Sequence, residues 1–148
     1  MERLVRQIDS LTKRLDQLEA QEGRLIYATW TPTVTQGGSV SYSGGTARYA
    51  RLGPLAIVGA NSGATTAGSA GSDIIVGGLP ATPKSAPAIV GTFRIQNKGG
   101  GTHYIGAAVV VLGSLKFQVS DTIAYVGTNP SYGMASGDII DFTVGFEV

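Results

Sequence analysis

The sequence predicts a mainly β protein: an antiparallel β-sandwich or jelly-roll head that follows a short parallel coiled-coil helix. Two contrasts along the chain support this prediction. The first 24 residues hold ten charged side chains and one of the 22 glycines, whereas the other residues hold the remaining glycines and all six prolines. We therefore place a boundary near Gly23, with residues 1–24 as a stem and residues 25–148 as the head.

The apolar residues of the stem recur at alternating spacings of four and three, which is the heptad pattern of a coiled coil. Position a is taken by Met1, Ile8 and Leu15, and position d by Leu4, Leu11, Leu18 and Leu25. The other positions are almost all polar, so the apolar stripe is narrower than that of a helix packed on a globular core. We expect the helix to end near Gly23, which follows a glutamate at an a position.

A single helix of this length is marginal in water, so the stripe predicts self-association. The residues expected to form the interface are Leu4, Ile8, Leu11, Leu15 and Leu18. In a parallel arrangement Arg14 faces Glu19 of the next chain, which is an opposite-charge pair. A dimer and a trimer both fit the heptads, and a lone helix that packs on its own head is the alternative.

Eight segments of the head are rich in Val, Ile, Thr, Tyr and Phe, and glycine-rich turns separate them. The segments are 25–35, 47–60, 73–76, 88–96, 104–112, 115–119, 122–126 and 139–148. No helical pattern lies between them, so a βαβ architecture is not expected. The Ala-, Gly-, Ser- and Thr-rich stretch 61–72 predicts a surface loop within one domain, with a flexible linker as the alternative. A further turn is predicted at 43–45.

Composition argues against several classes of function. The chain has no cysteine and one histidine, His103, so it offers no thiol chemistry and no multi-histidine metal site. A net charge of +1 gives no electrostatic basis for binding nucleic acid. No apolar run of about 18 residues predicts a membrane span, and no signal-peptide pattern opens the chain. We expect no cofactor.

Catalysis is not expected either. The carboxylates of the head are Asp73, Asp121, Asp138, Asp141 and Glu147. Asp138 and Asp141 are close in sequence, but such turn residues are usually solvated rather than paired across a cleft. No G-x-S-x-G elbow accompanies His103, and the glycine-rich segment 97–102 lacks the G-K-[ST] order of a phosphate-binding loop.

Two places in the head combine an aromatic side chain with hydrogen-bonding groups, as sugar-binding sites do. The loop 127–134 contains Asn129 and Tyr132, and a second place has His103 next to Tyr104. Because binding residues are often carried by loops on a rigid scaffold, we take these four as candidate ligand-binding residues. For Tyr132, packing at a subunit interface is the alternative.

The order of four short motifs resembles the C-terminal head domains of bacteriophage tail fibres and minor tail proteins. The motifs are Trp30-Thr31-Pro32, Tyr49 followed by Gly53, Gly78-Leu79-Pro80, and Gly137-Asp138 before the last apolar segment. The resemblance covers residues 29–148. The sequence departs from the pattern at Pro54, which stands where the family has a strand residue and cannot donate to a sheet ladder.

The resemblance implies a trimeric head on a coiled-coil stem at the virion surface. The stem would join other virion proteins, and the head would face outward and bind a host-surface glycan. The alternative is a capsid or tail decoration fibre with a purely structural role and no ligand. A secreted trimeric jelly roll of the cytokine-like kind is a third possibility, against which the missing signal-peptide pattern counts.

Overall fold

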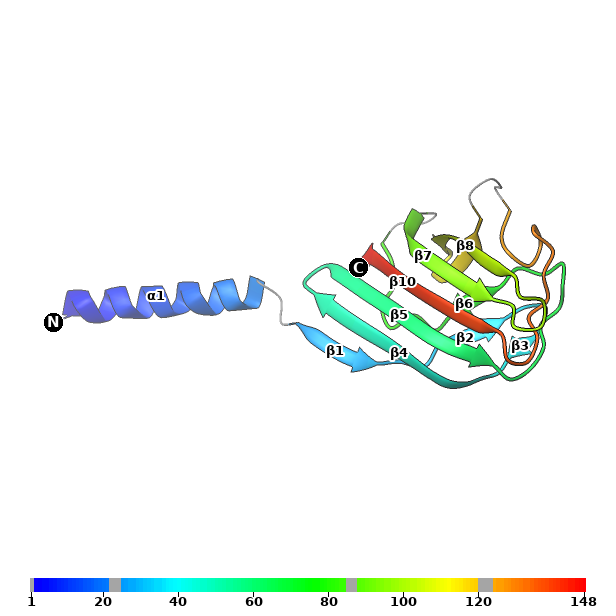
Figure 1. Ribbon diagram of the computed structural model, residues 1–148. Helices are drawn as coiled ribbons and strands as arrows, with labels where there is room; N and C mark the ends of the chain where they lie inside the picture. The colour runs from blue at the N-terminus through cyan, green and yellow to red at the C-terminus, as the bar shows by residue number, and fades with distance from the viewer. Residues whose placement is uncertain (1, 22–24, 85–87, 120–123) are drawn as a thin grey trace.

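The computed structural model describes residues 2–21, 25–84, 88–119 and 124–148, which form one helix and ten strands (Figure 1). The helix is α1 (Glu2–Gln21), and the first strands are β1 (Ile26–Thr29), β2 (Thr33–Thr35), β3 (Ser39–Val40), β4 (Tyr42–Leu52) and β5 (Leu55–Ala64). The later strands are β6 (Ile75–Gly77), β7 (Ala88–Gln96), β8 (His103–Val111), β9 (Ser114–Gln118) and β10 (Ile139–Glu147).

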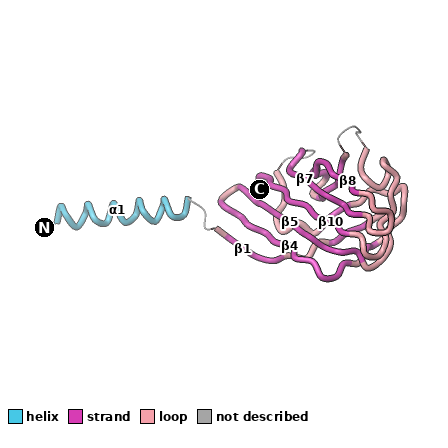
Figure 2. The backbone as a smooth tube through the Cα atoms, in the orientation of Figure 1, coloured by secondary structure: helices cyan, strands magenta, loops and turns pink. Residues whose placement is uncertain are grey.

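The predicted N-terminal helix is present, and it stands clear of the sheet (Figures 1 and 2). Ile8 is 54% exposed and Leu11 is 64% exposed, so this part of the apolar stripe meets solvent. The side chains of Leu4, Leu15 and Leu18 lie outside the described part of the chain. The helix therefore presents apolar side chains that nothing in the described chain covers.

The prediction of a mainly β, antiparallel fold is confirmed. The ten strands form one antiparallel sheet in the order β1-β4-β5-β10-β7-β8-β9-β6-β2-β3. The strands thus belong to a single sheet that curls, rather than to two separate sheets packed face to face.

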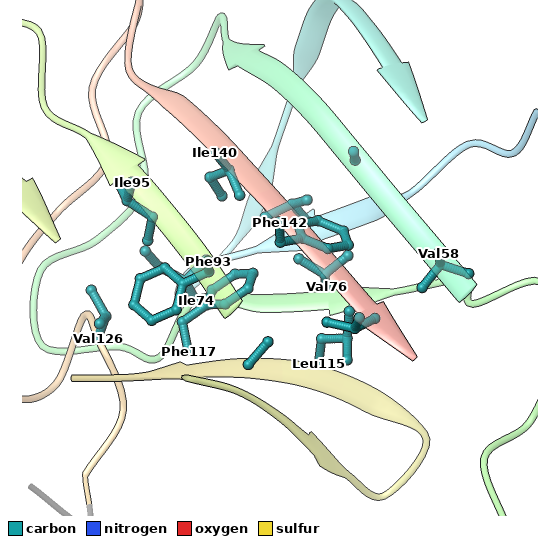
Figure 3. Close-up of a cluster of buried hydrophobic side chains, with 14 of the residues drawn as sticks. Val58, Ile74, Val76, Phe93, Ile95, Leu115, Phe117, Val126, Ile140 and Phe142 are labelled. Carbon is teal, nitrogen blue, oxygen red and sulfur yellow. The ribbon is translucent and has the colours of Figure 1, made fainter. Parts of the chain in front are cut away.

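The curl is visible in the contacts of Phe117 on β9. Three strand-to-strand steps separate β9 from β10, which would put them about 14 Å apart in a flat sheet. The rings of Phe117 and Phe142 nevertheless lie 5.8 Å apart between centroids, and Phe93 lies 4.8 Å from Phe117. These rings belong to the buried cluster of Figure 3, so the concave face of the curled sheet encloses the core.

The predicted strand 47–60 is divided into β4 and β5 by a tight turn. Gly53 adopts a φ of 55°, which favours glycine, and Pro54 lies in the turn, where it need not donate to the ladder. β5 then alternates along its whole length, with Ala56, Val58 and Ala60 buried.

The turn predicted at 43–45 is wrong, and the loop predicted at 61–72 is right only for residues 65–72. The segment 43–45 lies inside β4, where the register shifts between Ser43 and Thr46, and β5 continues to Ala64 through the start of the stretch 61–72. The reason is non-local: β5 pairs with both β4 and β10 as far as Gly63, and this pairing outweighs weak local strand propensity.

Two predicted strands also differ from those observed. The segment 25–35 is divided at residues 30–32 into β1 and β2, which lie far apart in the sheet order. Residues 124–126 are not in a strand, and the first part of the predicted segment 122–126 lies outside the described residues, as does Asp121.

Candidate functional site

Alternate residues of β1, β4, β5 and β10 point away from the core, toward the convex side of the sheet. We call this side the outer face. Because directly paired residues share a face, the register divides it into rows across the strands. One row is Tyr27, Ala50, Ile57 and Gly145; the next is Thr29, Arg48, Gly59 and Thr143; a third is Thr46, Asn61, Asp141 and Arg94. The outer face thus becomes more polar with distance from the β4–β5 turn.

A depression of about 420 Å³ lies on the outer face, and we call it the outer-face hollow. Its floor is low because Gly59 and Ala50 carry little or no side chain. Its lining combines apolar residues with polar and aromatic ones. The apolar residues include Ile57, Ala60 and Phe142, and the polar and aromatic ones are Tyr27, Thr46, Arg48, Asn61, Asp141 and Thr143. Its volume lies within the usual range of small-molecule sites, although it is an open depression and not an enclosed pocket.

Gly59 is required for this shape. It lies directly between Arg48 and Thr143 in the register. A Cβ atom at this position would stand 3.2 Å from the carbonyl oxygen of Phe142 and 3.5 Å from the Thr143 hydroxyl. A side chain here would therefore both crowd β10 and fill the hollow.

The charged groups of the hollow differ in their pairing. An Nη atom of Arg94 lies 3.1 Å from Oδ2 of Asp141, and both side chains are well exposed. Arg48 is exposed and has no ion-pair partner within the described ranges. The hollow thus holds one neutralised aspartate and one cation whose charge no described carboxylate balances.

The structure brings two of the predicted ligand-binding residues together. The rings of Tyr104 on β8 and Tyr132 lie 4.9 Å apart between centroids and are tilted by 44°. Tyr132 is only 5% exposed, and its hydroxyl donates to a carboxylate oxygen of Asp138. The ring of Tyr132 packs in the core, so it offers no exposed face on which a sugar could stack.

His103 and Asn129, the other two predicted ligand-binding residues, are exposed. His103 and Tyr104 are adjacent in β8 and so point to opposite faces of the sheet, with His103 outward and Tyr104 inward. Asn129 lies in the loop before Tyr132. The four residues therefore do not form one continuous exposed surface.

Tyr132 belongs to a buried polar network that we call the loop hub, made of Gln36, Tyr132 and Asp138. Gln36 is 1% exposed; its Nε2 donates to the carbonyl oxygens of Ser72 and Tyr132, and its Oε1 accepts from the amide of Met134 at 2.9 Å. The hub ties the β2–β3 turn to two distant loops. Sequence reasoning missed Gln36, since nothing local distinguishes it from a solvated turn residue.

Asp138 is fully buried and occupies the other end of the loop hub. It accepts the amide of Lys98 at 2.9 Å and the amide of Ala135 at 2.8 Å, besides the hydroxyl of Tyr132. Asp141, by contrast, lies on the outer face with Arg94. Asp138 and Asp141 therefore have separate sets of partners.

A second polar cluster lies on the other side of the head. Oδ2 of Asp73 is 2.8 Å from Nζ of Lys116, Oδ1 accepts from the Thr128 hydroxyl at 2.6 Å, and the Lys116 ammonium lies 4.7 Å from the centroid of the Tyr125 ring. Burial acts to raise the pKa of Asp73, but the hydrogen bonds from Lys116 and Thr128 and the charge of Lys116 outweigh it. The pKa of Asp73 therefore lies below its ordinary value.

Three general findings complete the description. Within the described ranges, no three side chains of His, Asp or Glu gather closely enough to hold a metal ion. The one described helix is too polar to cross a membrane. Comparison of the chain with protein-family models, curated proteins and solved structures found no match.

Proposed function

We propose that this chain is a homo-oligomeric phage virion protein, most simply a trimer, whose helix forms a parallel coiled-coil stem and whose head faces outward. The exposure of Ile8 and Leu11 supports the stem. Burying such a side chain contributes about 1.5–3 kcal/mol, which a solitary helix forgoes. The curled sheet, with its two halves facing each other across the core, would serve as the sandwich or jelly-roll head.

The end of the head nearest the helix supports self-association as well. Exposed apolar residues gather there: Leu25 and Ile26 at and just before the start of β1, and Leu52 and Leu55 at the β4–β5 turn. The register places Leu52 opposite Leu55 and Ile26 beside the same turn. Copies joined by the helix would bring these surfaces close together, where they can bury one another.

The head would bind a host-surface glycan, and the outer-face hollow is the observation that carries this part of the proposal. It combines an exposed tyrosine with a guanidinium, an amide, a carboxylate and two hydroxyls around a low floor. Such groups can hydrogen-bond sugar hydroxyls while an aromatic ring covers an apolar sugar face. The resemblance to phage tail-fibre heads supports glycan binding as the role of the head.

Light scattering of the full chain tests the stem. Three 15.2 kDa chains should give about 46 kDa, and two should give about 30 kDa. Leu11→Asp places a charge in the middle of the seam and should lower the mass or the melting temperature of the oligomer. Lys13→Ala, a change on the exposed side of the same helix, is the control. A monodisperse mass near 15 kDa for the parent would contradict the proposal.

Adsorption tests the head. The purified oligomer should bind bacterial envelopes, and an antibody against it should label the outside of intact particles in electron micrographs. If the particles carry the protein but the purified oligomer adsorbs to no bacterial envelope, glycan binding is rejected. That result would favour the decoration role, in which the stem docks onto the particle and the head binds no ligand.

A further inference from the structure

We infer that the outer-face hollow recognises an acidic sugar, whose carboxylate pairs with the guanidinium of Arg48. This inference rests on the proposed glycan-binding function and narrows its ligand class. It depends on one contrast: among the described basic residues of the head, Arg48 is the one that lines the hollow, and its guanidinium has no ion-pair partner.

Most basic side chains of the head already have a partner. Lys84 pairs with Glu147 at 2.9 Å, Arg94 with Asp141 at 3.1 Å, and Lys116 with Asp73 at 2.8 Å. Nε of Arg51 donates to the carbonyl oxygen of Gly53 at 2.9 Å. Within the described ranges, Arg48 is the basic residue that both lines the hollow and lacks an ion-pair partner.

The register leaves space around Arg48. On β5 its partner is Gly59, and on β1 its partner is Thr29, so neither direct neighbour carries a charge or a large side chain. The guanidinium can therefore lie over the bare floor with its hydrogen-bond donors accessible. A planar guanidinium matches a carboxylate with two parallel hydrogen bonds, which a neutral hydroxyl cannot accept.

The remaining groups suit the rest of a sugar ring. Oδ2 of Asp141 accepts from Arg94, which neutralises the aspartate and leaves Oδ1 to accept a sugar hydroxyl. Asn61 stands beside Asp141 in the register and offers both a donor and an acceptor. Tyr27 is 63% exposed at the opposite end of the hollow, where its ring can cover an apolar sugar face.

The charge balance favours a singly charged acidic group over a phosphate monoester. Arg94 is already neutralised by Asp141, so Arg48 supplies the one unbalanced positive charge of the hollow. One guanidinium balances one carboxylate, whereas the nearly two charges of a phosphate monoester would leave negative charge unbalanced near Asp141. We therefore take the ligand to be a sugar that carries one carboxylate on the bound residue.

The test uses the full oligomer and three pairs of oligosaccharides. Each pair contains an oligomer of galacturonic acid, glucuronic acid or sialic acid, beside the same oligomer with its carboxylates reduced to alcohols. In titration calorimetry at least one acidic form should bind about tenfold or more tightly than its reduced form. Raising NaCl from about 0.05 to about 0.5 M should weaken that binding, because the site is open to solvent.

Arg48→Gln should remove the preference for the acidic form, and Arg48→Lys should restore part of it. Arg51→Gln is the matched control, since it removes the same charge from the same strand on the opposite face of the sheet. Thermal melts should show that all three variants fold. Equal loss of acidic binding in Arg48→Gln and Arg51→Gln would point to net charge alone and overturn the assignment.

The failures of the two proposals can be told apart. If the parent oligomer adsorbs to bacterial envelopes but prefers none of the three acidic oligomers, the acidic-sugar inference is wrong and glycan binding stands. If it binds acidic and reduced oligomers equally, the inference is again wrong. If it adsorbs to no envelope and binds no oligomer, glycan binding and the inference fall together.

Discussion

The loop hub and the outer-face hollow each contain a tyrosine, a side-chain amide and an aspartate, which are buried in the hub and lie at the surface in the hollow. The hub has Tyr132, Gln36 and Asp138, and the hollow has Tyr27, Asn61 and Asp141. Every member of the hub is buried, and each is hydrogen-bonded within the chain. The three residues of the hollow lie at the surface. Among the hydrogen bonds described for their side chains, there is one, from Arg94 to Asp141.

This difference separates scaffold from binding site. A polar group whose hydrogen bonds are all made inside the protein has nothing left for a ligand, and breaking them costs stability. A polar group at the surface exchanges water for a ligand at little structural cost. Substitutions in the hub should therefore lower the free energy of unfolding, and matched substitutions in the hollow should lower sugar binding instead.

The aspartates give the largest expected contrast. Asp138→Ala leaves three donors without their acceptor: the amides of Lys98 and Ala135 and the hydroxyl of Tyr132. The free energy of unfolding should fall by about 3–5 kcal/mol, measured by urea denaturation. Asp141→Ala removes an exposed ion pair and should cost about 1 kcal/mol or less. Similar losses for both variants would contradict the division between hub and hollow.

The amides provide the second contrast. Gln36→Met keeps the length of the side chain but removes its bonds to Ser72, Tyr132 and Met134. We expect a loss of about 2–3 kcal/mol in the free energy of unfolding, and faster hydrogen exchange at the Met134 amide. Asn61→Leu on the outer face should leave stability within about 0.5 kcal/mol of the parent. Unchanged exchange at Met134 would mean that Gln36 does not hold this loop.

The strands show how far local sequence patterns predict this fold. β7 and β10 were predicted closely, because each is a long segment rich in β-branched and aromatic residues between clear turns. The segment 43–45 was assigned wrongly, because a glycine pair looks the same in a turn and at an irregularity within a strand. What distinguishes the two is pairing with β5, which no local pattern contains.

The site shows the same limit more sharply. Tyr132 lies among turn-forming residues, so its sequence context suggested an exposed loop aromatic, yet the fold buries it against Tyr104. The hollow was not predicted at all, since its residues come from β1, β4, β5 and β10 and meet only through the register. One signal was present: among the outward positions of β5, Gly59 stands between Ile57 and Asn61 and carries no side chain.

The tyrosines give a smaller contrast. Tyr132→Phe removes the hydroxyl that donates to Asp138 and keeps the ring against Tyr104, so the free energy of unfolding should fall by about 1–2 kcal/mol. Tyr27→Phe should leave stability unchanged within about 0.5 kcal/mol. Thermal melts of the two variants beside the parent measure both effects. A larger loss for Tyr27→Phe would show that the start of β1 is part of an interface rather than of an open site.

Asp73 is the intermediate case, part-buried and paired with Lys116 and Thr128, and it gives the smallest expected effect. Because its pKa in the folded state lies below the ordinary value of 3.8, folding is favoured by its ionised form. That stabilisation is present above the ordinary value and is lost as the pH falls through the lower folded value. Asp73→Asn should cost about 0.5–1 kcal/mol at neutral pH, and the difference from the parent should shrink below about pH 4. Urea denaturation of both proteins between about pH 7 and pH 2.5 measures this convergence. A constant difference over that range would show that the carboxylate stabilises the fold through packing and not through its charge.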